Sequence, residues 1–330
     1  MKKHIYQIDL IRAVCCIGII IYHFACHTNS NLSILTNTVN SDVGSIIVTA
    51  FFIVSGFVLY QNHKEVSSLK EYYIKRARSI FPSFYLCWFI FYVVNVIKVR
   101  TPFYAGNPLK LLLTLIGQDG YFSQRIVTYY TVGEWFLGAL IFVYLLYPLL
   151  LKLFNKNDKL TVSILLVLTL CIHYFNVPVI SPGFPGIIES CLKFSIGMLF
   201  NKYLDLLNDK KILVVSIIYF IVYSLVKINV LNVLLDLIYG ICLFVFLFNL
   251  GYLINNKIVN NISGLSYQIY LLQHMIIVNI LDLYNPSNTL ISILLMIICI
   301  ILTIIFAYII KKLVKIIMNK IDDKIVKDRS

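Results

Sequence analysis

Two ionisable residues stand in the first apolar stretch of the chain, where ionisable side chains are rare and costly. Arg12 and His23 occur in the segment DLIRAVCCIGIIIYHFACH (9–27), with ten residues between them. In a helix, eleven steps of 1.5 Å place them about 16 Å apart along the axis, and eleven steps of about 100° leave them close to one face. One stripe of this helix would therefore carry a guanidinium near one membrane surface and an imidazole near the other.

The chemistry that fits this pair is group transfer from a long donor with an anionic head. Near pH 7 an imidazole can take a proton from a hydroxyl as a general base, or it can carry the transferred group itself. Coenzyme A has phosphates at one end and a thioester at the other, so Arg12 and His23 would address its two ends. The alternative is that His23 is a packed polar residue bonded to a neighbouring helix, and His27 is expected on the same side at the membrane interface.

A cluster of cations in YYIKRARSIFPSFY (72–85) is the second candidate for donor binding. Lys75, Arg76 and Arg78 stand just before a long apolar segment, where Arg side chains can hold phosphate oxygens in bidentate pairs. Pro82 follows in the first turn of that segment, where its missing N–H costs least. The alternative is the ordinary positive charge that flanks membrane spans.

Further candidates occur at the start of, or inside, other apolar segments. Glu134 and Trp135 open one segment, and we expect the carboxylate to orient the imidazole or bind a sugar and the indole to stack on a sugar ring. An aromatic belt is the alternative for the indole. Glu189 and Lys193 are four residues apart, which predicts an internal ion pair. His274 is expected inside the membrane near its cytoplasmic half.

The composition predicts what must position these residues: a polytopic all-α bundle of membrane helices. Sixty per cent of the 330 residues are hydrophobic and 13% are charged, against about a quarter charged in soluble proteins. The net charge is +13, and the Lys and Arg residues lie mainly between apolar segments. This distribution favours membrane anchoring over nucleic-acid binding. The eight Cys include no CxxC pair and are interpreted as small core residues, not as a disulfide framework or a metal site.

Ten segments are long enough, or nearly so, to cross about 30 Å of hydrocarbon. They are Ile8–Ala25, Val43–Leu59, Ile80–Val99, Trp135–Phe154, Leu160–Phe175, Gly186–Leu204, Ile212–Val226, Val230–Ile254, Ile262–Leu283 and Leu290–Ile310. The run 109–117 is too short to span and is expected in the interface or as a re-entrant segment.

The distribution of charge predicts the orientation. If the N-terminus is cytoplasmic, 21 of the 28 Lys and Arg, Lys2 and Lys3 among them, fall inside and five fall outside. This asymmetry places both termini in the cytoplasm. We expect one membrane domain over residues 1–330, with a basic cytoplasmic tail from about 311 to 330.

Six stretches, taken in order from about residue 6 to about residue 280, resemble landmarks of one family of membrane proteins, the acyltransferase 3 family. Each is weak alone, and the ordered set is specific. The stretches are LIRAVCCIGIIIYH (10–23), FFIVSGFVLY (51–60), KRARSIFPSFY (75–85), EWFLGALIFVYLLYPLL (134–150), FSIGMLF (194–200) and SYQIYLL (266–272).

The resemblance implies ten or eleven helices and the transfer of an acyl group from cytoplasmic acyl-CoA to an outer-face glycan. Arg12 and His23 match the essential pair of the family, and Arg76 matches the first Arg of its Arg-x-x-Arg motif. The chain departs from the pattern at three positions, where the family usually has Arg, Glu and His. Those positions hold Ser79, Leu140 and Gln273, which implies a different acceptor or reduced activity.

The leading hypothesis is therefore an O-acyltransferase, most simply an O-acetyltransferase using acetyl-CoA, in a bacterial cell membrane. Its acceptor would be a surface polysaccharide or a lipid-linked glycan, and no metal and no nucleic acid is expected in the reaction. A homodimer or polysaccharide-assembly partners stay open. The alternatives are a transporter or flippase, which would show broken helices in matched halves, and an inactive scaffold in polysaccharide export.

Overall fold

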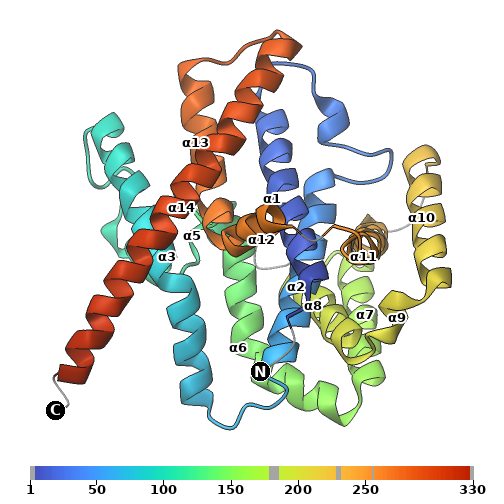
Figure 1. The fold of residues 1–330 in the computed structure, drawn as a ribbon. Helices are drawn as coiled ribbons and strands as arrows, with labels where there is room; N and C mark the ends of the chain where they lie inside the picture. Colours follow the sequence, from blue (N-terminus) through green and yellow to red (C-terminus); the bar gives the residue numbers. More distant parts are fainter. Residues whose placement is uncertain (1–3, 178–185, 228–231, 255, 328–330) are drawn as a thin grey trace.

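The computed structural model describes residues 4–177, 186–227, 232–254 and 256–327 (Figure 1). These residues form α-helices joined by loops and short 3-10 turns, with no β-strand among them. The predicted all-α class is thus confirmed. Lys2 and Lys3, and the first residues of the predicted span 230–254, lie outside the described residues.

Each of the ten predicted apolar segments falls on a helix or a helix pair. The single helices are α1 (Tyr6–His27), α2 (Val43–Asn62), α3 (Leu69–Val99), α6 (Glu134–Lys156), α7 (Asp158–Tyr174), α8 (Ile187–Lys202), α10 (Lys210–Leu225), α11 (Asn232–Leu250) and α14 (Thr289–Lys327). The predicted span 262–283 is instead the end of α12 (Lys257–Gly264) and all of α13 (Ser266–Leu283), two helices that meet at an angle of 71°.

Within the described residues, six helices are long and apolar enough to cross a membrane, and the bent α12–α13 pair makes seven if it counts as one span. The chain is therefore a multi-pass membrane protein. Helices α7, α8 and α10 have 17, 16 and 16 residues, which is short of the roughly 20 needed for an upright span. The total of ten spans and the cytoplasmic termini remain predictions, although α1 begins and α14 ends toward the same side of the bundle (Figure 1).

Helix α2 lies inside the bundle and contacts α1, α8 and α11. Two glycines permit its close approach to α8. An added Cβ at Gly56 would lie 1.9 Å from the carbonyl oxygen of Phe194, and one at Gly197 would lie 1.9 Å from that of Ile53. Small residues are the usual means by which membrane helices pack closely. Here they hold α2 against α8, and α2 in turn contacts α1.

One predicted charge pair is confirmed inside α8. Nζ of Lys193 lies 2.6 Å from Oε1 of Glu189, and both side chains are buried. Nε2 of His173, on α7, lies 3.1 Å from the other carboxylate oxygen. The pair satisfies two charges that would be costly alone in an apolar interior.

The connection between α3 and α6 braces the start of α6. It holds 3-10 helix η2 (Pro108–Lys110) and the short helices α4 (Leu111–Leu115) and α5 (Asp119–Phe122), so the run 109–117 does not form a spanning helix. Gly120 of α5 packs so closely that an added Cβ would lie 2.4 Å from the carbonyl of Glu134.

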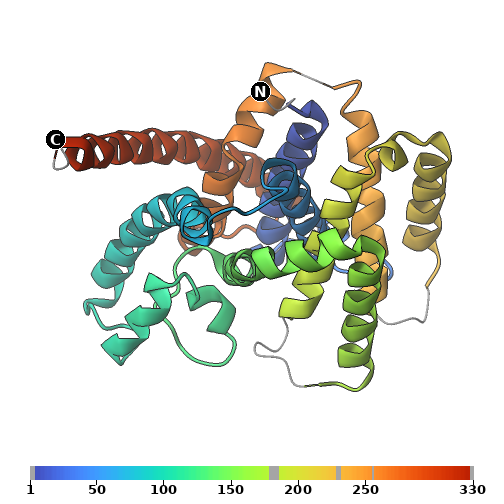
Figure 2. The ribbon, with the colours of Figure 1, turned by 90° about the horizontal axis from the view of Figure 1, so that it is seen from below.

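The remaining short elements are η1 (Ser33–Leu35) and α9 (Asp205–Asn208), and all eight Cys are free thiols, six of them buried. The predicted tail from residue 311 continues α14 as a helix as far as Lys327, and Figure 2 shows this end of α14 extending beyond the other helices.

Candidate active site

The His23 end of the predicted stripe on α1 meets the first residue of α6. Nε2 of His23 lies 3.2 Å from Oε2 of Glu134, and their side chains are 16% and 12% exposed. A carboxylate that contacts an imidazole fixes the orientation of the ring and stabilises it when it takes a proton. The structure therefore brings this carboxylate and this imidazole together, as the sequence predicted, in an arrangement that suits a general base.

The backbone at Glu134 is held in an uncommon conformation. Gly133 and Glu134 have φ values of 88° and 25°, and a non-glycine residue at positive φ costs on the order of 1–3 kcal/mol, a feature that clusters at functional sites. The hydroxyl of Tyr270 contacts the carbonyl oxygen of Gly133 and lies 3.0 Å from the backbone nitrogen of Leu137, whose hydrogen bond it accepts. Helix α13 thus holds the first turn of α6 in place.

Two further side chains of α13 contact the same carboxylate. Nε2 of Gln273 donates a hydrogen bond to Oε1 of Glu134 at 2.7 Å, and Nδ1 of His274 lies 3.5 Å from that oxygen. Gln273 is fully buried. Gln273, one of the three departures from the family pattern, therefore supports the carboxylate of Glu134, which orients His23.

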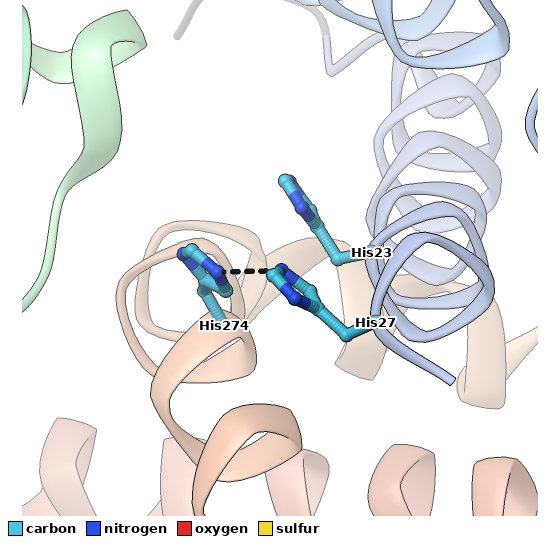
Figure 3. Close-up of side chains that lie close together, drawn as sticks. All are labelled: His23, His27 and His274. Carbon is cyan, nitrogen blue, oxygen red and sulfur yellow. Dashed lines mark hydrogen bonds between the residues drawn. The ribbon is translucent and has the colours of Figure 1, made fainter. Parts of the chain in front are cut away.

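A second contact links α13 back to α1. Nε2 of His274 lies 3.0 Å from Nε2 of His27, and the two rings and that of His23 form one group (Figure 3). The hydroxyl of Tyr130 lies 3.2 Å from Nδ1 of His274. Burial and the neighbouring Glu134 raise the pKa of the Tyr130 hydroxyl, so this hydroxyl stays protonated.

The prediction that placed His274 toward the opposite, cytoplasmic end of the bundle from His23 was wrong, because the two rings lie side by side. The bend between α12 and α13 starts α13 inside the bundle, where the carbonyl oxygen of Ser266 contacts Sγ of Cys16 near the middle of α1. Eight residues further along, about 12 Å at 1.5 Å per residue, His274 has already reached the level of His23 and His27. A continuous helix from residue 262 was the wrong premise.

A cavity of about 300 Å³ opens beside His23 and Glu134, and we call it the histidine cavity. Its polar lining includes Tyr22 and Asp42, whose side chains share a hydrogen bond of 2.8 Å. The predicted substrate-binding residue Trp135 also lines it. The cavity offers an aromatic face and hydrogen-bonding groups beside the imidazole.

A second cavity of about 380 Å³, the arginine cavity, lies at the other end of the stripe. Arg12, Arg76 and Lys311 line it together with several polar groups. The guanidinium of Arg76 lies 5.8 Å from the ring centroid of Tyr144, a distance at which the cation and the ring attract each other. Three cations around one cavity create a site for an anionic group.

Three aromatic side chains line both cavities: Phe51, Phe136 and Tyr270. The ring centroids of Phe51 and Phe136 are 6.0 Å apart, and those of Phe136 and Tyr270 are 5.4 Å apart. We call these three rings the aromatic septum. It is the shared wall between a cationic cavity and a cavity that contains a histidine–carboxylate pair.

The structure divides the predicted donor-binding residues. Arg12 and Arg76 meet in the arginine cavity, and Ser79, the departure from the Arg-x-x-Arg motif, lines it as well. Lys75 and Arg78 do not line it; Arg78 instead pairs with Asp322 of α14, and both side chains are about half exposed.

Sequence reasoning missed Lys311 and Tyr270 as parts of the site. Lys311 was assigned to the tail, yet its Nζ donates a hydrogen bond of 2.7 Å to the carbonyl of Gly264 beside the arginine cavity. Tyr270 lies in SYQIYLL, a stretch that resembles a family landmark, and that likeness was the available signal.

The comparisons with known proteins agree with this geometry at the level of the family. A family model described as an acyltransferase domain matches residues 5–312, which is nearly the whole chain. No curated protein and no solved structure matches the chain. The sequence landmarks, the multi-pass helical fold and the match over residues 5–312 lead to one conclusion: the chain belongs to the acyltransferase 3 family of membrane proteins.

Proposed function

We propose that this protein is an O-acetyltransferase of a bacterial cell membrane that transfers the acetyl group of cytoplasmic acetyl-CoA to a hydroxyl of a surface polysaccharide or a lipid-linked glycan. The observation that carries the proposal is the pair of cavities that share the aromatic septum. One cavity suits the anionic head of the donor, and the other suits the hydroxyl of the acceptor.

The arginine cavity is the proposed donor site. Arg12, Arg76 and Lys311 would hold the phosphates of acetyl-CoA, since guanidinium groups bind phosphate oxygens in bidentate pairs. The pantetheine arm would then extend along α1 toward the septum and present the thioester to His23. The separation of about 16 Å between Arg12 and His23 along the helix suits a donor whose charged and reactive ends are far apart.

The histidine cavity is the proposed site of transfer. His23 takes the proton of the acceptor hydroxyl, the oxygen attacks the thioester carbonyl, and a C–O bond forms as the C–S bond breaks. The proton then passes from the imidazolium to the departing thiolate, which gives the ester and free CoA. Glu134 holds the ring and stabilises the imidazolium between these steps.

The lining of the histidine cavity supports a sugar acceptor. Trp135 offers a face on which a pyranose ring can stack, and Asp42 and Tyr22 offer hydrogen-bonding groups for its hydroxyls. Together these groups would orient one hydroxyl toward His23 and hold the ring away from the septum.

The test is transfer of label from radioactive acetyl-CoA to glycan in inverted vesicles of the native membrane, with wild type and His23→Ala at matched expression. The proposal expects transfer in wild type and a loss of at least about 100-fold in His23→Ala, the lower end of what a general base contributes. Equal transfer in both proteins would remove His23 from the mechanism, and no transfer in either would remove the proposed activity.

A further inference from the structure

Among the described residues, one group of three side chains has the composition of a metal site: His23, His27 and His274. His23 and His27 are four residues apart on α1, the spacing that places two imidazoles on one face of a helix in helical zinc sites. The third imidazole comes from α13 (Figure 3). We propose that these three histidines bind one divalent transition-metal ion of the zinc class at the mouth of the histidine cavity.

The distances between the rings suit a tetrahedral ion. Zinc–imidazole bonds of about 2.0–2.1 Å at tetrahedral angles place two ligand nitrogens about 3.3 Å apart. Nε2 of His27 and Nε2 of His274 are 3.0 Å apart, and one nitrogen from each of the three histidines lies within 4.8 Å of the others. The third ring therefore needs to close by about 1.5 Å. The rings of His23 and His27 lie at 22° and 29° to that of His274, so the imidazoles must also turn to direct their nitrogens at one ion.

Metal-bound histidines usually donate the N–H of their second ring nitrogen to a carboxylate or another acceptor. Such acceptors lie next to these rings. Glu134 provides this support for His23, whose Nε2 lies 3.2 Å from the carboxylate. The hydroxyl of Tyr130 provides it for His274, at 3.2 Å from Nδ1, with the carboxylate of Glu134 at 3.5 Å. Gln273 in turn donates to Glu134. This leaves Nε2 of His274 and Nδ1 of His23 as the ligand atoms.

The donor set determines which ion is bound. Three neutral imidazoles favour Zn²⁺, Cu²⁺, Ni²⁺ or Co²⁺ over Mg²⁺ and Ca²⁺, which prefer oxygen ligands. His27 is exposed, so an ion can reach the site from the aqueous side without crossing the septum. Three protein ligands leave a fourth position for water.

A bound ion would act on the proposed reaction by occupying its base, and this consequence rests on the proposed function. With Nδ1 of His23 on the metal and its Nε2–H donating to Glu134, the imidazole has no free lone pair to accept the proton of the acceptor. The site would therefore inhibit transfer, and the ion would not take part in the chemistry.

Binding is tested first without any activity measurement. The purified full-length chain in detergent, with any affinity tag removed, is titrated with Co²⁺, whose tetrahedral complexes absorb in the visible region. The expected result is a visible band that saturates near one ion per chain and disappears when Zn²⁺ is added. No band up to millimolar Co²⁺ would overturn the proposal.

Variants locate the ion. His27→Gln removes an exposed ligand at little risk to folding and should weaken Co²⁺ binding by at least about tenfold; His274→Gln should do the same. His173→Gln is the matched control, because His173 lies on α7 next to Glu189 and the Glu189–Lys193 pair stays intact without it. Equal affinity in all three variants would place the ion elsewhere and contradict the proposal.

Inhibition is measured separately. Zn²⁺ at the concentration that fills the site should lower acetyl transfer by wild type, and a chelator should restore it. His27→Gln should need at least about ten times more Zn²⁺ for the same inhibition. A protein that binds Co²⁺ but transfers no acetyl group would contradict the proposed function and leave the metal site standing.

Discussion

Nε2 of Gln273 donates a hydrogen bond of 2.7 Å to Oε1 of Glu134. The bond comes from a position where the family usually has histidine, and it reaches the carboxylate that contacts His23 on its other oxygen. A departure that suggested reduced activity in the sequence is thus a structural support of the candidate base. Leu140, another departure from the family pattern, lies instead in the lining of the arginine cavity.

Glu134 is expected to contribute to transfer through His23. Glu134→Gln keeps the size of the side chain but removes the charge that stabilises the imidazolium, so kcat should fall by at least about 100-fold. The KM for acetyl-CoA should change little, because the proposed donor site is the other cavity. The check is initial rates in inverted vesicles, with the exposed Glu65→Gln as control. A large rise in KM with kcat unchanged would assign Glu134 to substrate binding alone.

The two arginines of the basic stretch are expected to differ. Arg76 lines the arginine cavity, so Arg76→Ala should raise the KM for acetyl-CoA by about 10-fold or more, as expected when a charge-assisted hydrogen bond is lost. Arg78 pairs with Asp322 outside that cavity, so Arg78→Ala should stay within about twofold of wild type. The same effect from both variants would count against the arginine cavity as the donor site.

The aromatic septum is expected to keep water from the thioester. Phe51 lines both cavities, so Phe51→Ala should open a path between them and raise hydrolysis of acetyl-CoA without acceptor by at least about threefold. Phe89 of α3 is 57% exposed, and Phe89→Ala serves as the control for loss of an aromatic ring. Release of free CoA thiol is the measurement. Unchanged hydrolysis in Phe51→Ala would show that this ring does not separate the cavities.

The connection between α3 and α6 carries a buried acid that should make stability depend on pH. Asp119 is 1% exposed, and burial raises the pKa of its carboxyl to about 6. The folded protein therefore binds this proton more tightly than the unfolded chain, and the stability from this group is present below about pH 4 and lost as the pH rises through about 6.

Asp119→Asn removes that dependence. At pH 7.5 the variant should melt about 2 °C above wild type, a shift that corresponds to about 1 kcal/mol in a chain of this size. The difference should shrink as the pH falls toward 4.5. Thermal unfolding in detergent across this range is the measurement, and a difference that stays constant with pH would refute the assignment.

The sequence predicted the helices well because the hydrophobic segments are long and separated by charges. It placed the spans at α1, α2, α3 and α6 within a few residues at most ends, although α3 begins before the predicted span, in the basic stretch. It did not predict the break at Leu265, where no proline or charge stands, although Ser263, Gly264 and Ser266 interrupt the apolar pattern at that point.

The candidate site could be predicted only in part, because some of its contacts depend on the packing between helices. Arg12 and His23 share one helix, so their spacing was sufficient to relate them. The contact between His23 and Glu134 was expected from their common end of the membrane, whereas the approach of His274 depends on the bend and could not be read from spacing. Lys311 reaches the arginine cavity because α14 packs beside α13 as a continuous helix, a tertiary relationship that composition does not encode.

The most direct test of the central claim is the sidedness of transfer. In sealed inverted vesicles, labelled acetyl-CoA cannot cross the bilayer and is supplied only to the cytoplasmic face, while the native glycan faces the lumen. The account predicts that wild type esterifies the lumenal glycan and that His23→Ala does not. Label that appears only when glycan is added on the same side as acetyl-CoA would contradict transfer from the arginine cavity to the histidine cavity through the aromatic septum.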